Sequence, residues 1–385
     1  MRRRHLDWSR RIAATILLAI LTRGPVAATV DDNAQQGASP ARPDGKDPSR
    51  RLSLGLSFLS FYDDNVLQLS DIDMERFRKN PDSPRFDIKS TDDTIAQGAI
   101  SLEWRTRPLP RRDTTLDASA TTYQYVRDDV KDFARYSAAV SQELTASRRH
   151  LATLEARASL TPHFYLRRLT DNDASFEAGR VIRRGVTYAE TDYGLFYRQS
   201  IVRDRLEGRI GWEAQVRNYN DHFDERDGTK DILSASLKVR PAARSKITIR
   251  ATYQGGDLEA EGDLASSPIP DEDISYRHHA FALESAFPWS RPAGGRIEVE
   301  LQRETRDYTT DDPFDLCHFD RKDIRRDYRW RLVQRVSKKL ELVAELRRRT
   351  TATTIPALVD PSNCTDETEF EQHRIMIGLT WHLDF

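Results

Sequence analysis

Three consecutive segments near the C-terminal end of the chain carry arginine and glutamate at alternate positions. They are Glu298, Glu300 and Glu304 in the first segment, Arg329, Arg331 and Arg335 in the second, and Glu341, Glu345 and Arg347 in the third. Alternate residues of an extended strand share one face, so an Arg-rich strand between two Glu-bearing strands predicts cross-strand ion pairs. Such a charge ladder either stiffens a wall of the protein or forms a charged constriction that selects solutes.

A second polar motif is the run Tyr62-Asp63-Asp64-Asn65. Asp and Asn side chains accept hydrogen bonds from nearby backbone N–H groups and so favour turns. The run therefore predicts a rim at which the chain leaves a strand, held by its own side chains. The alternative is a calcium site, because carboxylate and amide oxygens are the ligands that Ca²⁺ takes.

Other motifs that would indicate an enzyme, a metal centre or a nucleic-acid-binding protein are missing from the sequence. It contains no Gly-rich phosphate loop, no HExxH and no nucleophile elbow. Neither His278-His279 nor Cys317-His318 has the spacing of metal ligands. The formal net charge of −1 lacks the basic excess of a nucleic-acid-binding protein. We therefore expect no enzymatic activity, no cofactor, no metal centre built from His or Cys, and no nucleic-acid partner.

The segment that ends the chain shows which element could position these residues. Read at every second position, residues 375–385 are wholly apolar and finish on Trp381, Leu383 and Phe385. The alternate register, from Arg374 to Asp384, is mostly polar. A period of two indicates a β-strand with a different solvent on each face.

Similar segments recur through the chain, separated by gaps that alternate between long and short. The predicted strands are 51–61, 94–106, 113–126, 133–144, 150–165, 187–199, 205–219, 231–239, 245–255, 275–287, 296–308, 324–336, 340–350 and the segment that ends at Phe385. Strands of about ten residues, apolar on one face, fit the thickness of an outer membrane. We therefore predict an all-β fold, a transmembrane antiparallel up-and-down β-barrel of about fourteen strands. An even number of strands places both termini in the periplasm, with short turns there and long loops outside.

The N-terminal part of the chain predicts export. Residues 1–28 combine Arg2-Arg3-Arg4, an apolar core too short to span a bilayer and the small residues Val26-Ala27-Ala28, which is typical of a cleaved signal peptide. Residues 29–50 have almost no large apolar side chain and predict a disordered periplasmic tail. The barrel domain is then 51–385.

The two cysteines, Cys317 and Cys364, fall in two outer loops that flank one predicted hairpin. Two cysteines in an exported chain are more often bridged than free, so we expect a disulfide between them. The alternatives are two free thiols or a labile redox pair.

Two stretches resemble known families. The terminal strand that ends on Phe385 resembles the last strand of bacterial outer-membrane β-barrels, which implies that Trp381, Leu383 and Phe385 form the signal read by the barrel-assembly machinery. The rim run Tyr62–Asn65 resembles a stretch of porin-like families, namely the putative β-barrel porin type 2 group and the barrel part of surface lipoprotein assembly modifiers. No helical repeat precedes the barrel in this sequence, so the second resemblance covers the barrel alone.

These observations lead to a ranked set of functions. We expect an outer-membrane channel of the porin kind that passes small hydrophilic solutes. The alternative is a non-conducting or export-associated barrel for polysaccharide or surface lipoprotein assembly, and the third is a structural or adhesin-like barrel. The outer loops are acidic, for example at Asp71, Asp73, Asp224 and Glu225, so divalent cations could bridge them to lipopolysaccharide.

Overall fold

The computed structural model describes residues 50–109, 112–146, 151–171, 174–175, 178–242, 246–260, 273–290, 294–310, 315, 317–355 and 369–385. The predicted signal peptide and the tail before Arg50 lie outside the described residues. Within the described part of the chain, no helix is both long and apolar enough to cross a membrane.

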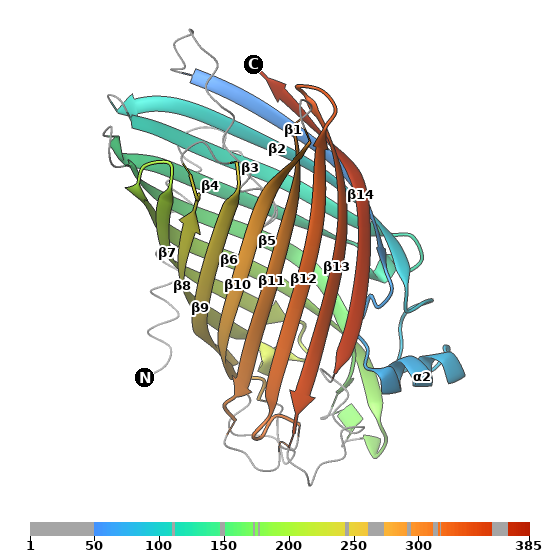
Figure 1. Cartoon of the computed structure of the whole chain (residues 1–385). Helices are drawn as coiled ribbons and strands as arrows, with labels where there is room; N and C mark the ends of the chain where they lie inside the picture. The colour runs from blue at the N-terminus through green and yellow to red at the C-terminus, as the bar shows by residue number, and fades with distance from the viewer. Residues whose placement is uncertain are drawn as a thin grey trace.

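The chain forms a closed antiparallel barrel in which each strand pairs with its neighbours in sequence and β1 pairs with β14 (Figure 1). The strands are β1 (Arg50–Asp63), β2 (Asp93–Leu109), β3 (Arg112–Tyr125), β4 (Phe133–Ala146), β5 (Leu151–Asp171), β6 (Ile182–Val202), β7 (Leu206–Tyr219), β8 (Gly228–Val239), β9 (Thr248–Ala260), β10 (Tyr276–Ser290), β11 (Gly295–Tyr308), β12 (Lys322–Arg335), β13 (Leu340–Thr354) and β14 (Phe370–Asp384). The prediction of an up-and-down barrel of fourteen strands is confirmed.

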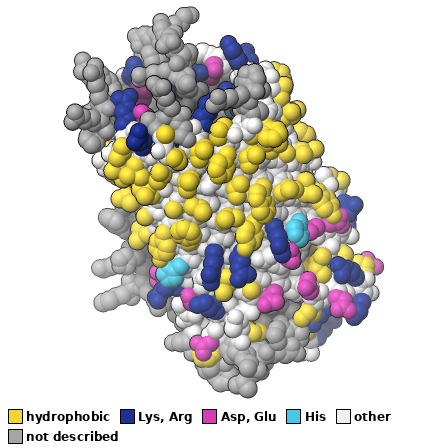
Figure 2. Space-filling view, in the orientation of Figure 1, with side chains coloured by type: hydrophobic (Ala, Val, Ile, Leu, Met, Phe, Trp, Pro, Cys, Tyr) yellow, Lys and Arg dark blue, Asp and Glu magenta, His cyan; other side chains and the backbone are white. Residues whose placement is uncertain are grey.

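The two faces of the strands differ as the period of two predicts. On β14 the side chain of Ile377 is 64% exposed on the outside of the barrel, whereas Met376 beside it is 5% exposed. On the face seen in Figure 2, the outward-facing side chains form a broad apolar band across the middle of the barrel. An apolar exterior around a polar interior is the reverse of a water-soluble β-protein, and it is what a barrel in a lipid bilayer requires.

Closure of the barrel depends on the seam between β1 and β14. Leu54 lies opposite Leu383, and the pairing continues to Asp63 opposite Arg374. The backbone N–H of Phe385 donates to the carbonyl oxygen of Leu52 at 2.9 Å, one residue beyond the last strand. Pairing the first strand with the last removes both sheet edges, which would otherwise expose unpaired N–H and C=O groups.

Connections of different length gather at the two ends of the barrel. The segment 64–92, which joins β1 to β2, lies at the opposite end from the C-terminus (Figure 1). The turn 203–205, between β6 and β7, lies at the same end as the C-terminus. The alternation of long and short gaps in the sequence is therefore an alternation between two ends of one barrel. We call the end that carries segment 64–92 the outer end.

The structure departs from the predicted elements mainly at the outer end. Strands β5 and β6 have 21 residues each and extend past their predicted ends, and β5 shifts register between Thr161 and Phe164 and again between Tyr165 and Arg168. A helix, α2 (Asp71–Lys79), lies within the segment predicted as a loop. Its signals are present in the sequence, because the Ser70 side chain caps the backbone N–H of Asp73 at 3.2 Å and acidic residues fill the first turn.

A small hydrophobic core holds these outer segments together. Phe77 of α2 packs edge-on against Phe86, and both belong to a buried cluster that also contains Tyr165 of β5. The remaining buried members are Val66, Leu67, Leu69 and Ile88. The connection between β1 and β2 is therefore a folded cap on the outer end rather than an open loop.

Candidate functional site

The predicted charge ladder lies on the interior face of the barrel. Across β11, β12 and β13, Glu300, Arg329 and Arg347 form one row of directly opposite residues, and Glu298, Arg331 and Glu345 form the next. The alternate positions hold exposed apolar side chains such as Trp330 and Leu346, which point out of the barrel. The pleat of the strands thus separates the charges from the apolar band.

Several of the expected ion pairs are present in this ladder. Arg329 pairs with Glu300, and the Arg331 Nη1 lies 3.9 Å from the Glu298 Oε2. Arg335 pairs with Glu341 at 3.3 Å near the end that carries the C-terminus. These contacts join β12 to both neighbouring strands, so the central Arg-rich strand is held by carboxylates on either side.

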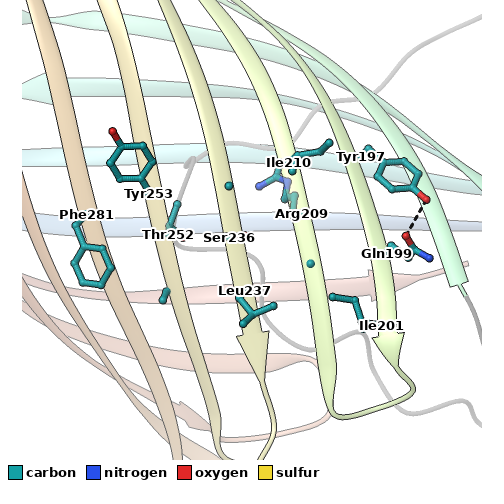
Figure 3. Close-up of a pocket in the computed structure, with 13 residues that line it drawn as sticks. Tyr197, Gln199, Ile201, Arg209, Ile210, Ser236, Leu237, Thr252, Tyr253 and Phe281 are labelled. Carbon is teal, nitrogen blue, oxygen red and sulfur yellow. Dashed lines mark hydrogen bonds between the residues drawn. The ribbon is translucent and has the colours of Figure 1, made fainter.

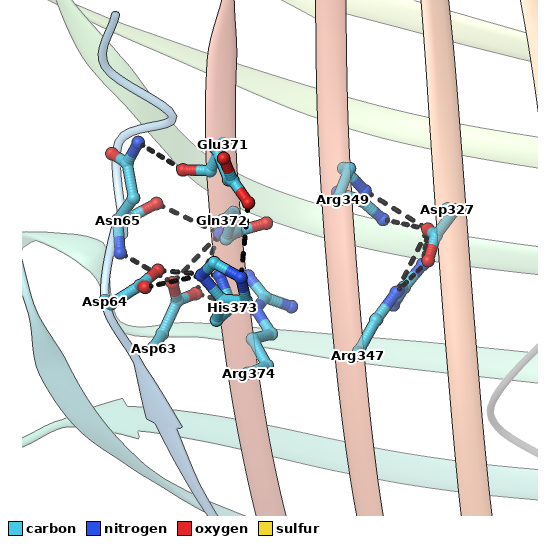
Figure 4. A network of polar contacts seen from close by, with 10 residues as sticks. All are labelled: Asp63, Asp64, Asn65, Asp327, Arg347, Arg349, Glu371, Gln372, His373 and Arg374. Carbon is cyan, nitrogen blue, oxygen red and sulfur yellow. Dashed lines mark hydrogen bonds and ion pairs between the residues drawn. The ribbon is translucent and has the colours of Figure 1, made fainter. Parts of the chain in front are cut away.

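Two members of the ladder have partners that the sequence pattern did not indicate. Glu304 accepts a hydrogen bond from Arg306 of its own strand at 2.7 Å, and the Lys230 Nζ from β8 lies 4.0 Å away. Arg347 pairs with Asp327 of β12, which also accepts from Arg349 at 3.2 Å (Figure 4). Asp327 therefore binds two arginines of β13, although only glutamates were assigned as the acidic members of this ladder.

The rim motif forms a polar latch across the seam of the barrel (Figure 4). The buried carboxylate of Asp63 accepts from the Arg374 Nε at 2.6 Å and from the Gln372 Nε2 at 2.9 and 3.0 Å. Asp64 accepts from the backbone N–H of His373 at 2.7 Å, and its second carboxylate oxygen lies 3.0 Å from the His373 Nδ1. The two aspartates thus tie β1 to β14 at the point where β1 ends.

Asn65 and Tyr62 extend this latch to the cap. The Asn65 side chain accepts from the backbone N–H of Leu69 at 2.7 Å and donates to the carbonyl oxygens of Leu69 and Glu371 at 2.8 and 3.0 Å. The Tyr62 hydroxyl donates to Asp92 at 3.3 Å. The self-capped rim expected from the sequence is visible in these contacts. The oxygen atoms that the calcium alternative would use accept from protein donors, and the described residues contain no group of three carboxylate, His or Cys side chains placed to hold a metal.

The charge ladder of β11 to β13 forms one charged wall of the barrel interior. Strands β4 to β7 form a second charged wall, which the sequence pattern did not indicate. Its ion pairs are Arg135 with Asp192 (2.7 Å), Arg157 with Glu213, Arg209 with Glu155 (3.3 Å), Arg198 with Glu155 (3.8 Å) and Arg217 with Glu190 (2.8 Å). The alternation within the predicted strands 150–165 and 205–219 already places several of these residues on one face. The sequence does not show which of these charges meet, because partners such as Arg157 of β5 and Glu213 of β7 lie on strands that are not adjacent and meet across β6.

An aromatic side chain organises this second wall. Phe196 of β6 is buried inside the barrel, with the guanidinium of Arg209 at 3.9 Å and that of Arg157 at 4.5 Å from the centre of its ring. The ring lies over Gly211 of β7, where a Cβ atom would collide with it. A glycine here leaves room for the ring against the wall, and the ring face attracts both cations.

The two charged walls face each other across the barrel interior. In the ring of fourteen strands, β6 and β13 are seven steps apart in either direction. The strands between the walls carry both small polar groups, such as Ser236 on β8, and charged ones, such as Arg250 of β9, which pairs with Glu284 of β10 at 3.2 Å. The interior is therefore lined by charged and polar side chains, with the two charged walls on opposite sides.

Comparison with known proteins supplies no closer assignment. No protein-family model and no curated protein matches this sequence. Similar solved structures are outer-membrane proteins. The match to a bacterial polysaccharide outer membrane secretin covers 86% of this chain and 98% of the secretin chain, with 10% identity and a TM-score of 0.40. The anion-selective porin from Comamonas acidovorans covers 87% and 99%, with 8% identity and a TM-score of 0.40. The TodX monoaromatic hydrocarbon channel covers 89% and 91%, with 8% identity and a TM-score of 0.44. Likenesses at this level give no solute for the present chain.

On the outward face of β6 to β10, which is the other side of these strands from the barrel interior, lies a groove of about 430 Å³ (Figure 3). Its floor is formed by the small residues Gly208, Ala235 and Ala251, and its sides include Ile210 and Phe281. Most of the lining belongs to the apolar outward register. The groove is therefore a hollow in the apolar band and not part of the charged interior.

The other predicted site residues lie apart from the charged walls. Trp381 and Phe385 are exposed on the outward face of β14, with Leu383 between them in the same register. Cys317 is half-buried in the turn 317–320 that precedes β12. Cys364 lies outside the described residues, so the disulfide stays a prediction. We expect non-reducing mass spectrometry of proteolysed protein to find the two cysteine peptides linked, whereas alkylation of both thiols without reduction would exclude the bridge.

Proposed function

We propose that this protein is an outer-membrane channel for small hydrophilic solutes rather than an enzyme. One observation carries the proposal: the closed barrel is apolar outside and lined inside by two opposed charged walls. A continuous apolar exterior suits lipid, while ionised side chains on the interior face require water or oppositely charged partners. A water-filled interior that exposes such groups offers a path for solutes that lipid excludes.

The wall chemistry supports weak rather than strong ion selectivity. Arginines and carboxylates alternate within each wall and pair with one another, as Arg329 does with Glu300. Paired charges largely cancel each other's field at a distance, so neither cations nor anions gain a large advantage. The same pairing makes the balance sensitive to single changes, because removal of one arginine leaves a carboxylate without its partner.

Planar-bilayer recording of the purified full chain tests the proposal. We expect stepwise conductance with a small preference for one ion sign. Arg329→Gln should shift the reversal potential toward cation preference, since it leaves Glu300 uncompensated inside the barrel. Arg348→Gln is the matched control, because Arg348 lies on the outward register of the next strand and should leave selectivity unchanged.

Two results would contradict the channel. Correctly inserted barrels that do not conduct would favour the non-conducting or export-associated alternative. Equal shifts in selectivity from both arginine variants would show that the interior register does not line the path of the ions.

A further inference from the structure

The apolar band ends at its outer edge in a row of basic side chains. Five adjacent strands, β10 to β14, each carry a basic side chain in the outward register at this edge of the apolar band: His279, Arg303, Arg326, Arg348 and His373. Figure 2 shows Lys and Arg side chains, with His among them, along the lower edge of the apolar band. This row faces away from the barrel interior, so the channel proposed above does not account for it.

Arg303 and Arg326 form an unusual pair within this row. They are directly opposite each other on β11 and β12, and both are exposed. Side chains at directly opposite positions start about 5 Å apart at Cβ, and like charges there are destabilising. Within the described part of the chain, neither arginine forms an ion pair or a side-chain hydrogen bond. Among the described residues, no carboxylate pairs with either of these two positive charges to relieve their repulsion.

The neighbouring cations differ from this pair, because they have acidic partners. Arg348 pairs with Glu371 at 2.7 Å, and Arg277 pairs with Asp257 at 3.1 Å. Lys322 follows Arg326 and Ile324 in the outward register of β12, and it pairs with Asp307 at 2.8 Å. Among the arginines and lysines named here, only Arg303 and Arg326 have no acidic partner within the described part of the chain, whereas His279 contacts the Tyr253 hydroxyl at 2.8 Å.

Apolar and aromatic side chains border the pair on the side of the apolar band. Phe281 lies directly opposite Arg303 on the other side of β11, and Leu301 and Tyr328 are the next outward residues toward the middle of the barrel. A ligand on the two arginines would therefore meet water on one side and an apolar surface on the other. That environment suits a molecule with an anionic head and hydrocarbon chains.

We propose that Arg303 and Arg326 bind the phosphate group of a lipid in the outer leaflet of the membrane. Each guanidinium presents a planar fork of N–H donors that matches phosphate oxygens, and one doubly charged phosphate compensates both cations. The hydrocarbon chains of the lipid then lie along the apolar surface that begins at Phe281, Leu301 and Tyr328. The proposed site binds a lipid on the outer surface of the barrel and takes no part in the passage of solutes through the interior.

Native mass spectrometry of the full-length barrel in detergent, titrated with diphosphorylated lipid A, tests this site. We expect the wild type to retain the lipid and the double variant Arg303→Gln/Arg326→Gln to bind it roughly tenfold to a hundredfold more weakly, since two charge-assisted contacts are lost. The matched control is Lys338→Gln/Lys339→Gln, which removes the same charge from exposed positions in the β12–β13 turn at the other end of the barrel. The control should bind lipid A as the wild type does.

The comparison with a second probe separates phosphate recognition from apolar adsorption. Dephosphorylated lipid A should bind weakly and equally to all three proteins. Equal retention of diphosphorylated lipid A by the wild type and the Arg303/Arg326 variant would overturn the proposal, as would equal affinity of the wild type for the two lipids. Channel conductance of the double variant reports folding independently, because neither arginine faces the interior.

Discussion

Asp63 is fully buried at the seam of the barrel, where its carboxylate accepts from Arg374, Gln372 and the backbone N–H of Asn65. The carboxylate and its donors hold one another in place across the seam. Asp63 therefore acts as a structural latch between β1 and β14, the first and last strands, whose pairing closes the barrel.

Replacement of this latch should weaken the barrel measurably. Asp63→Asn removes the negative charge opposite Arg374 and should cost about 1.5–3 kcal/mol, the usual range for a hydrogen bond to a charged group. Asp64→Asn should cost less, because the contact between Asp64 and His373 is exposed to water. The temperature at which the folded band converts to the unfolded band on a gel measures both variants. Equal behaviour of the two would contradict the latch.

Lys131 is a buried cation in the short 3₁₀ helix (Asp129–Lys131) between β3 and β4, at the outer end of the barrel. Its ammonium donates to the carbonyl oxygen of Tyr165 at 3.4 Å and lies about 6 Å from the ring centres of Tyr125 and Tyr165. Burial, followed by the nearby charge of Arg167, lowers the pKa of Lys131 from 10.5 to about 7. The carboxylates of Asp63 and Asp128 oppose this shift, and Arg374 adds to it.

The lowered pKa of Lys131 predicts a pH dependence for the outer cap. Between about pH 7 and pH 10.5 the opened cap binds a proton at Lys131 that the closed cap does not, so the closed state gains stability as the pH rises through this window. Digestion of segment 64–92 by a protease active over this range should slow as the pH rises. Lys131→Met should remove the pH dependence, and a dependence that persists in this variant would assign it to another group.

At the scale of the strand, one step along the chain exchanges the outside of the barrel for its interior. Leu233 and Ser234 are neighbours on β8, and Leu233 is 66% exposed within the apolar band whereas Ser234 lies in the interior register. This separation is the physical basis of the whole barrel, and adjacent residues provide a matched test of it.

We expect Leu233→Arg to reduce folding into lipid vesicles far more than Ser234→Arg does. A charge on the lipid face costs about 2–4 kcal/mol at the membrane centre, whereas an interior arginine stays in contact with water or with carboxylates. The folded fraction after dilution from denaturant into vesicles measures the difference. Similar losses from both variants would show that the assignment of the two faces to lipid and water is wrong.

At the scale of the whole molecule, the barrel exists only when its last strand pairs with its first. Phe385 is 73% exposed on the outward face, while its backbone completes the β1–β14 ladder through Leu52. The side chain is thus not needed for packing within the barrel. We propose that the assembly machinery reads this side chain, as the resemblance to the terminal strands of outer-membrane barrels implies.

Because the Phe385 side chain is exposed, its replacement should affect assembly of the barrel in cells without changing the stability of the folded barrel. We expect Phe385→Ala to lower the amount of barrel in the outer membrane of cells, while the same variant folds into lipid vesicles in vitro as well as the wild type does. Heat-modifiable gel mobility measures both quantities. A matching defect in vitro would assign the residue to stability, and normal assembly in cells would contradict the recognition role.

The sequence by itself determined the strands, their two faces and part of the charge ladder. All of these depend on short-range order: a period of two marks each strand, and strands that follow each other in sequence pair with each other. The pair Arg329–Glu300 could be predicted because its two residues lie on consecutive strands. The helix α2 differs from the predicted loop although its capping signals are local, because a long gap between two strands by itself predicts a loop.

Some contacts were decided only by the tertiary structure, because they form when the barrel closes or when its sheet curves around the interior. Arg374 reaches Asp63 across 311 positions of sequence because the barrel closes, and Lys230 approaches Glu304 because β8 and β11 curve around a common interior. The choice of Asp327 over the glutamates as the partner of Arg347 also depends on side-chain packing that no spacing shows. Alternation along a strand places a charge on a face, but the strand pairing and closure of the whole barrel determine which other charge it meets.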